Sequence, residues 1–362
     1  MRRRPLETLR PVGPVCRAAG DGENPLFLAD VRHEEDDHVV EGTLRCPSPS
    51  CQREYPILDG IPLLIANLRS YVAGAIDQIN AREDLAPTTE SLLGDCCGPG
   101  SAYDATRQHL STYAWDHYGD LDPHETGQIR PGSVRSVLER GLEMAGEISE
   151  GPLLDLGCAV GRTTFELAAR TDRPVVGADL GYAMLRLAAR TLREGRVRYP
   201  RRRVGLVYDQ RDFPVRFSNG EHVDFWACDA LALPFPSGTF AAVVGLNVLD
   251  CVQSPHGLLA ALPLLLAPGG RAILSTPYDW SPAATPVEAW LGGHSQRGEA
   301  AGASEPVLRA LLTPGAHPAS IEGLRIVAEE PALPWRVRLH ERAVMEYRVD
   351  LVVAERNVSF QA

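Results

Sequence analysis

Lysine is missing from this chain of 362 residues, because all 36 basic residues are arginine. No lysine amine is therefore present to act as a nucleophile or to form a Schiff base. Long apolar runs are also missing: the longest, at 258–267, is short and contains a proline, whereas a bilayer-spanning helix needs ~20 apolar residues. The basic start is not followed by the apolar segment of a signal peptide. We therefore expect a cytoplasmic protein with no membrane partner.

The composition is that of a globular protein, with 44% hydrophobic and 23% charged residues. At about 150 residues per domain, the length predicts two domains, or one large domain with an appendage. The net charge of −11 argues against nucleic acid as a partner of the whole surface. Eight cysteines in a cytoplasmic chain favour free thiols or a metal site over disulfides.

From about residue 105, strand-like apolar runs alternate with amphipathic helical segments. The expected strands lie at 152–157, 174–180, 223–230, 240–249 and 270–277, and the expected helices at 162–170, 182–195 and 256–266. This alternation predicts an α/β fold with a doubly wound, mostly parallel sheet. We predict a small loop-rich module at 1–68, a linker at 69–104 and a large domain at 105–357.

The first expected strand of that domain ends in a glycine turn that leads into a helix. Asp155 lies on the strand, and Gly157 and Gly161 permit a sharp turn and close approach of a ligand to the backbone. A glycine turn of this kind also occurs in dinucleotide-binding folds. The acid, however, would repel a pyrophosphate and suits the ammonium group of a methionine moiety. The pattern therefore favours S-adenosylmethionine over a dinucleotide.

Two further acids end the next two expected strands. Asp179 is placed to accept both ribose hydroxyls, and Asp229 with the backbone of Ala230 is placed near an adenine amino group. Each acid alone is more simply a helix N-cap or a solvated loop residue. Because the carboxyl ends of parallel strands share one edge of a sheet, three acids at three consecutive strand ends indicate a ligand site.

These residues resemble class I S-adenosylmethionine-dependent methyltransferases over about 105–355. The resemblance implies a mostly parallel, seven-stranded Rossmann-like sheet, and Ala159 replaces the middle glycine of the family's first motif. It also implies cofactor contacts from Cys158, Leu180, Met184 and Asn247.

Four segments are similar to the methyltransferase domain of ovothiol synthases, which methylates an imidazole nitrogen of a thiolated histidine. They are STYAWDHYG (111–119), NVLDCV (247–252), PYDW with TPVEAWLGG (277–293) and LPWRVRLHERAVMEYRVDLVVAER (333–356), and the glycine-turn segment LDLGCAVGRTTFELA (154–168) is similar as well. The iron-dependent sulfur-inserting part of those enzymes has no counterpart here, so no such activity is implied. The insert at 196–205 and the loop at 296–306 have no evident counterpart in the family.

The resemblance implies a small, aromatic-lined acceptor site for an imidazole-like substrate. We expect Tyr278 and Trp280 to enclose a flat ring, and Asn247 and Asp250 to orient one ring nitrogen. The expected substrate residues are Tyr113, His117, Tyr118, Trp290, Arg338, His340 and Glu341. The simpler alternatives are that the aromatics belong to the core, and that Arg336, Arg338 and His340 form the solvent face of a strand.

The segment LRCPSPSCQREYPILDGIPLL (44–64) resembles the zinc-ribbon-like module of the tRNA-methyltransferase activator family. That family uses four cysteines, whereas this chain offers Cys16, Cys46 and Cys51, with Gly13 where another ligand is expected. Either His33 or His38 completes a zinc site, or the module has lost its metal, which we favour.

Three functions remain open. The favoured one is N-methylation of a small imidazole-type molecule. The second is methylation of RNA or protein, with the arginines between 196 and 203 contacting phosphates, and the third is a non-catalytic partner protein. The intact Asp155, Gly157, Asp179 and Asp229 argue against the third. No oligomeric state is predicted.

Overall fold

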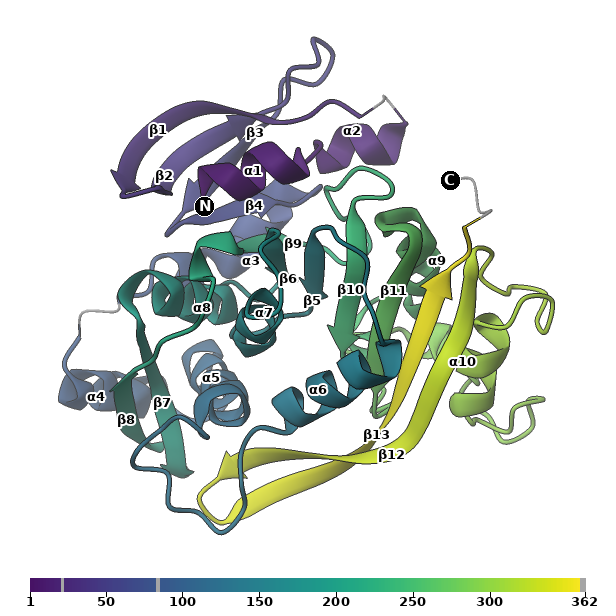
Figure 1. Ribbon diagram of the computed structural model, residues 1–362. Coiled ribbons are helices and arrows are strands. Elements are labelled where there is room, and N and C mark those ends of the chain that lie inside the picture. Colours follow the sequence, from purple (N-terminus) through teal and green to yellow (C-terminus); the bar gives the residue numbers. More distant parts are fainter. Residues whose placement is uncertain (21–22, 83–84, 359–362) are drawn as a thin grey trace.

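The computed structural model describes residues 1–20, 23–82 and 85–358. Within these residues one large sheet of eleven strands runs through the molecule in the order β1-β2-β3-β4-β9-β6-β5-β10-β11-β13-β12 (Figure 1). Its strands are β1 (Phe27–Glu35), β2 (His38–Arg45), β3 (Glu54–Leu58), β4 (Ile61–Leu64), β5 (Leu153–Leu156), β6 (Val175–Asp179), β9 (Val223–Cys228), β10 (Phe240–Leu246), β11 (Leu266–Thr276), β12 (Leu324–His340) and β13 (Ala343–Arg356). A separate hairpin pairs β7 (Arg196–Val204) with β8 (Val207–Pro214).

Helices cover both faces of the sheet, because its central strands bury side chains on both sides. In β6, for example, Val176 and Ala178 pack into one hydrophobic cluster and Val175 into the other. The first cluster includes residues of α1 (Arg3–Leu9), α2 (Pro14–Ala19), α9 (Pro255–Leu265) and α10 (Glu305–Leu311). The second includes residues of α5 (Ala102–Tyr118), α6 (Ser133–Ala145), α7 (Arg162–Ala168) and α8 (Tyr182–Glu194).

The predicted α/β architecture is confirmed. The five expected strands correspond to β5, β6, β9, β10 and β11, and the three expected helices to α7, α8 and α9. Strands β4, β9, β6, β5, β10 and β11 run parallel, and β13 joins β11 in the antiparallel direction. None of the described helices combines the length and the apolar character that crossing a bilayer requires.

The sheet differs from the expected seven strands, because the N-terminal strands extend it. Residues 153–356 contribute seven strands to the sheet. The N-terminal strand β4 extends it by pairing with β9, where Leu63 lies opposite Ala227 and Leu64 opposite Cys228. Residues 1–68 therefore share a sheet with the large domain. Asp59 strengthens the junction, because its Oδ2 accepts hydrogen bonds from Tyr182 Oη at 2.7 Å and from Arg186 Nε at 2.9 Å.

The segment expected to be a linker contains two helices, α3 (Leu68–Ile79) and α4 (Pro87–Cys97). Leu68, Tyr71, Val72 and Ile79 of α3 pack against the second hydrophobic cluster. Helical spacing of these apolar residues gives α3 one face that packs against the domain. The segment is therefore structured and lies beside α8, where it reaches the strand ends described below.

The basic insert at 196–205 forms β7 of the separate hairpin. Ion pairs join its two strands, with Arg196 Nη2 2.8 Å from Asp212 Oδ1 and Arg203 bound to Asp209. Opposite charges placed across an antiparallel pair stabilise it modestly. The hairpin packs beside α5 and near the far end of the long β12 and β13 ribbon (Figure 1).

Candidate methyltransferase site

A glycine loop joins β5 to α7 at the carboxyl end of the sheet. Gly157, Ala159 and Gly161 have positive φ angles of 73°, 47° and 90°. A Cβ atom on Gly161 would lie 2.7 Å from the ring of Phe225 and 2.8 Å from the Cβ of Ala188, so only glycine fits there. Ala159 holds a left-handed conformation where the family has glycine, which costs of order 1 kcal/mol.

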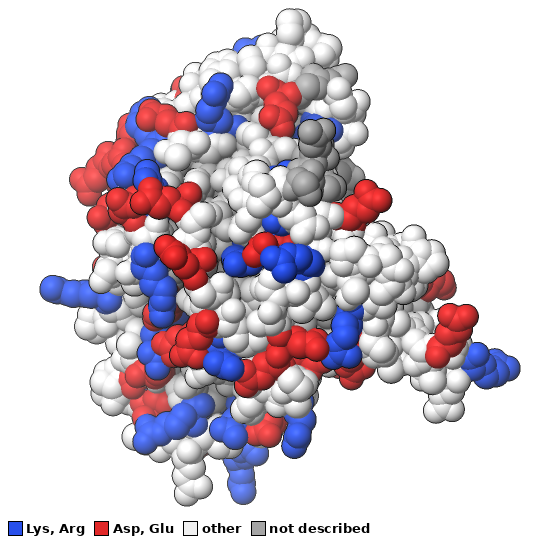
Figure 2. Space-filling model, turned by 45° about the vertical axis from the view of Figure 1, so that its right-hand side comes forward, with Lys and Arg blue, Asp and Glu red and all other residues white. Residues whose placement is uncertain are grey.

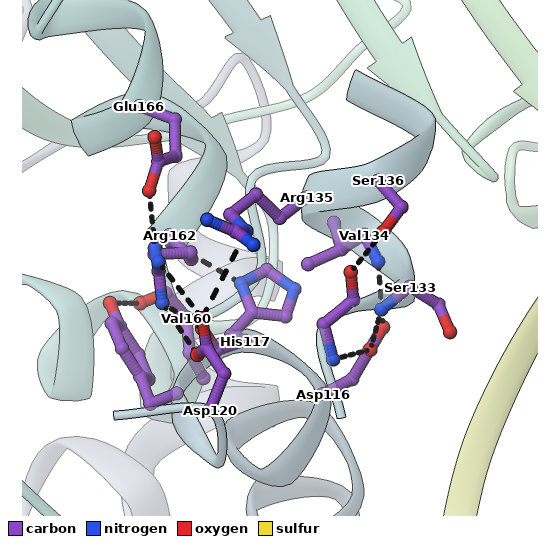
Figure 3. A network of polar contacts seen from close by, with 12 residues as sticks. Asp116, His117, Asp120, Ser133, Val134, Arg135, Ser136, Val160, Arg162 and Glu166 are labelled. Carbon is purple, nitrogen blue, oxygen red and sulfur yellow. Dashed lines mark hydrogen bonds and ion pairs between the residues drawn. The ribbon is translucent and has the colours of Figure 1, made fainter. Parts of the chain in front are cut away.

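A buried network behind this loop holds it in place (Figure 3). Tyr118 Oη donates to the carbonyl of Val160 at 2.5 Å, and His117 Nδ1 accepts from the backbone N–H of Arg162 at 3.2 Å. The Arg162 guanidinium bonds the carbonyl of His117 and the carboxylate of Asp120. Burial lowers the pKa of His117 to about 3, which keeps its ring neutral.

His117 and Tyr118 were expected to bind substrate, but their positions in the structure do not fit this role. Both side chains are buried, and each makes a hydrogen bond to the backbone of the glycine loop. They sit in this place because α5 packs its inner face under the loop. Neighbouring Asp116 accepts bonds from the N–H groups of residues 132–134 at the start of α6, a capping role that the sequence did not reveal.

Asp155 lies under the first turn of α7. Its Oδ2 accepts hydrogen bonds from the hydroxyls of Thr163 at 2.5 Å and Thr164 at 2.6 Å. Burial raises the pKa of this carboxyl to about 6. These bonds fix the turn that follows β5, and contact between Asp155 and an ammonium group stays a prediction.

Asp179 joins two loops at the end of β6. Its Oδ2 accepts from the N–H of Ala159 at 2.8 Å and its Oδ1 from the N–H of Gly181 at 2.7 Å. Each carboxylate oxygen has a second lone pair that can accept a further bond. The next residue, Leu180, is 52% exposed, and half-buried Met184 follows one turn into α8.

Tyr71 of α3 also reaches the end of β6, although the sequence did not mark it as a site residue. Its hydroxyl donates to the carbonyl of Leu180 at 3.0 Å. Burial, with smaller effects of Asp179 and Cys228, raises the pKa of Tyr71. The helical spacing of apolar residues in α3 was the one sequence feature that could have indicated that this helix packs against the domain.

The third expected acid, Asp229, follows β9. Its Oδ1 accepts from the N–H of Leu231 at 2.9 Å, which shapes the turn that contains half-buried Ala230. Cys158 in the glycine loop is buried, and burial raises the pKa of its thiol well above the ordinary value. The structure thus places the three expected acids at the carboxyl ends of three neighbouring parallel strands, β5, β6 and β9.

A second group of polar residues follows β10, and we call it the acceptor cluster. It consists of Tyr113 from α5, Asp250 and Cys251 from the turn η2 (Leu249–Cys251), Asp279 and Tyr347. The N–H of Asp279 donates to Asp250 Oδ2 at 2.8 Å, and Tyr347 Oη donates to Asp279 Oδ2 at 3.0 Å. Asn247, just before the cluster, has a φ of 55° and accepts from Ser275 Oγ at 2.8 Å.

Asp250 is the most buried member of the acceptor cluster. Its side chain is 3% exposed, and its Oδ1 has no hydrogen-bond partner. Burial raises the pKa of this carboxyl to about 6. Tyr113 is 43% exposed, and burial followed by Cys251, Asp179 and Asp250 raises its pKa. The charges of the β6 acid and of the β10 acid thus both act on the Tyr113 hydroxyl.

The aromatics of the loop after β11 are turned elsewhere. Tyr278 Oη donates to Asp350 Oδ2 at 3.3 Å, and the rings of Trp280 and Trp290 stack with centroids 6.4 Å apart. Their indole N–H groups donate to Ser304 Oγ and to the carbonyl of Thr285. The hydrogen bonds of these three side chains go to residues of the loop and to β13, and none goes to Asp179 or Asp250.

The expected substrate residues of the C-terminal ribbon lie at its far end. Arg338 is buried, His340 is half-buried, and Glu341 is exposed at the turn between β12 and β13. The N–H of Glu341 donates to the carbonyl of Arg203 at 3.0 Å, which fixes this turn to the β7–β8 hairpin. Arg336 is exposed and pairs with Glu346 at 2.7 Å, in agreement with the solvent-face alternative.

The three cysteines of the N-terminal module come together. Their Sγ atoms lie within 4.8 Å of one another, and no other His, Cys, Asp or Glu of the described residues joins this group. His33 is exposed beside Glu35, and His38 lies beside Arg2 and Asp224. A Cβ on Gly13 would lie 3.8 Å from Cys16 Sγ, so the expected fourth position faces the thiols but carries no side chain. Three thiols alone do not complete a tetrahedral zinc site.

We predict that purified protein contains well below one zinc per chain. Replacing Gly13 by Cys should raise the content toward one, because the backbone there is not left-handed, with a φ of −59°, and points a side chain at the thiols. Elemental analysis measures this. One tightly bound zinc in the unchanged chain, lost in Cys46→Ser, would show that another group completes the site.

Comparison with known proteins agrees with this geometry. Residues 129–303 match the family model described as a methyltransferase domain. This part of the chain is therefore similar to methyltransferase domains. It is 29% identical over 171 residues to the ubiquinone biosynthesis O-methyltransferase of Nitrosococcus oceani, a match that covers 47% of this chain and 58% of that protein. This chain thus spans little more than half the length of that curated relative.

Two solved structures show distant likeness. One is phosphoethanolamine N-methyltransferase 2 of Haemonchus contortus, with 18% identity over 47% of this chain and 35% of that chain, and a TM-score of 0.33. The other is a complex of a Haloferax volcanii methyltransferase activator with a methyltransferase, with 14% identity over 71% of this chain and all 100% of that chain, and a TM-score of 0.40. Neither likeness bears on what this chain methylates.

Proposed function

We propose that this chain is an S-adenosylmethionine-dependent methyltransferase that methylates a ring nitrogen of a small imidazole-type molecule. The observation that carries the proposal is the buried Asp250, whose Oδ1 has no partner, in the acceptor cluster. The Tyr113 hydroxyl is subject to the charges of both this carboxyl and Asp179, the expected ribose ligand. The similarity to the methyltransferase domain of ovothiol synthases supports the same acceptor.

The residues at the strand ends fit the cofactor. The left-handed Gly157 and Gly161 let a ligand approach the backbone, and Asp179 keeps lone pairs for ribose hydroxyls. Cys158, Leu180, Met184, Asp229 and Ala230 would surround the adenosine, with Tyr71 fixing the Leu180 carbonyl. When bound, S-adenosylmethionine supplies a methyl group that its sulfonium already activates.

Asp250 suits an azole acceptor for a chemical reason. A neutral imidazole has one N–H donor and one nitrogen with a free lone pair. If the N–H donates to Asp250 Oδ1, the carboxylate orients the ring and leaves the other nitrogen free to attack. Methylation turns the ring into a cation, and Asp250 can then take the N–H proton. Tyr113 and Tyr347 offer flat faces for the ring.

The alternative, a macromolecular substrate, rests on the arginines of the β7–β8 hairpin. These arginines already have partners: Arg198 pairs with Glu90 at 3.1 Å, Arg201 with Glu125 at 3.0 Å and Arg203 with Asp209. On the face drawn in Figure 2, the described basic and acidic side chains are interspersed rather than gathered. Phosphate binding needs basic groups that are not already neutralised.

A methyl-transfer assay with labelled cofactor tests the proposal against histidine, thiolated histidine, a catechol, peptides and RNA in parallel. The catechol represents the hydroxyl acceptors that the name of the O-methyltransferase relative indicates. We expect label on an azole nitrogen, with little change in Arg202→Ala combined with Arg203→Ala. Arg201 is left intact because its ion pair with Glu125 is largely buried. Labelled RNA, with a steep dependence on salt, would support the macromolecular alternative instead.

A further inference from the structure

In the described part of the chain, Arg338 is a buried cation that forms no ion pair. Arg338 on β12 is 3% exposed, and neither its Nη1 nor its Nη2 has a hydrogen-bond partner. Burial and the nearby charge of Arg201 lower its pKa only to about 10, so the guanidinium stays charged at neutral pH. A buried charge without a partner is strongly unfavourable. Binding of an anion next to Arg338 would remove this unfavourable energy.

The surroundings of Arg338 are rich in charge, and we call them the hairpin cluster: Asp122, Glu125, Tyr199, Arg201, Arg211 and Arg338. Tyr199 and Arg201 lie two residues apart on β7 and therefore face the same side of the hairpin, and Arg211 is the register partner of Tyr199 on β8. The turn at Glu341, fixed to Arg203, brings β12 against this side.

Two of the three arginines in the hairpin cluster are neutralised. Arg201 makes two hydrogen bonds to Glu125, at 3.0 and 3.1 Å, and Arg211 Nε lies 3.3 Å from Asp122 Oδ2. Three guanidinium groups thus face two carboxylates, with one positive charge in excess on Arg338. The buried hydroxyl of Tyr199 also has no hydrogen-bond partner.

Exposed Glu341 does not supply the missing charge. It raises the pKa of Arg338 as the last of several effects, but no ion pair joins the two residues. Arg107 is another buried arginine with an unpartnered Nη1, but its guanidinium lies 4.0 Å from the ring centroid of Tyr208. Arg107 thus has an aromatic face as compensation.

We propose that the hairpin cluster binds a small oxyanion, a carboxylate or a phosphate, through Nη1 and Nη2 of Arg338 and the hydroxyl of Tyr199. The parallel N–H groups of a guanidinium match two oxygens of such an anion. A neutral hydroxyl adds a third donor without adding charge. The residues of this site are different from Asp179 and the acceptor cluster, and Arg338 is among the substrate residues expected from the sequence.

Anion-dependent thermal unfolding tests the site without any assay of activity. The intact chain is heated with increasing formate or phosphate at constant ionic strength set with chloride. We expect the midpoint to rise with saturation in the unchanged chain and in Arg336→Gln, a matched exposed arginine of the same strand. The apparent affinity should fall at least tenfold in Arg338→Gln and several-fold in Tyr199→Phe. No saturable rise in the unchanged chain, or an equal rise in Arg338→Gln, would overturn the proposal.

The oxyanion is either the carboxylate of the methyl acceptor or a free ion. The possibility that it belongs to the acceptor rests on the proposed function. If the acceptor supplies it, Arg338→Gln raises the KM for histidine but not for histamine, which lacks the carboxylate. If a free ion supplies it, both KM values stay unchanged while the effect of formate on unfolding is lost. Failure of the proposed function would remove the activity readout and leave the unfolding result intact.

Discussion

Asp250→Asn is expected to reduce kcat on an azole substrate by about 100-fold, the size of effect found when a group that stabilises developing charge is removed. The neutral amide cannot stabilise the positive charge that develops on the ring as the methyl group is transferred. The unchanged enzyme should also lose activity as the pH falls through about 6, because the raised pKa places protonation of Asp250 there. The variant lacks this carboxyl and should lose the acid limb due to Asp250, whereas protonation of the imidazole acceptor, with an ordinary pKa of about 6.5, limits the rate in both proteins. Rates measured between pH 5 and 9 under saturating cofactor show both effects.

Loss of stability does not account for such a result. The folded-state pKa of Asp250 is above its unfolded value, so its contribution to stability is fully present below about 4 and is lost as the pH rises through about 6. At neutral pH the neutral amide should therefore leave stability unchanged or higher. Asp212→Asn, an exposed carboxyl on the hairpin, is the control. A normal rate in folded Asp250→Asn would contradict the assignment.

The sequence was sufficient to predict the strand-end residues. Asp155, Asp179 and Asp229 each follow an apolar run, and parallel strands bring their carboxyl ends to one edge. The glycine loop was also predictable, because Gly157 and Gly161 adopt backbone angles that other residues rarely take. These are local signals, and a doubly wound fold turns them into spatial neighbours.

Contacts between distant segments were not predictable in the same way. The apolar run of β4 indicates a strand, but not that Leu63 pairs with Ala227. Aromatic content after β11 indicated a pocket wall, whereas the direction of Tyr278 follows from Asp350 on a strand 72 residues away in the chain. His117 and Tyr118 matched a family segment, but only packing of α5 beneath the glycine loop shows that they hold backbone rather than substrate.

Asp179→Ala is expected to weaken binding of S-adenosylmethionine by about 10- to 150-fold, which corresponds to the ~1.5–3 kcal/mol of hydrogen bonds to a charged group. The change removes the proposed ribose acceptor. It also frees the N–H groups of Ala159 and Gly181, which Asp179 holds in the two loops beside the cofactor. Isothermal titration with S-adenosylmethionine measures the dissociation constant.

Asp172→Ala provides a matched control, because this aspartate is exposed in the loop before β6 and pairs only with its neighbour Arg173 at 3.5 Å. It should bind the cofactor as the unchanged chain does. Because Asp179 also shapes the loops, the variant must be shown to unfold cooperatively near the normal midpoint. With that established, a dissociation constant within twofold of the unchanged chain would mean that the ribose is held elsewhere. A loss limited to Asp179→Ala places the cofactor at the end of β6, next to Tyr113 and the carboxyl that we assign to the acceptor.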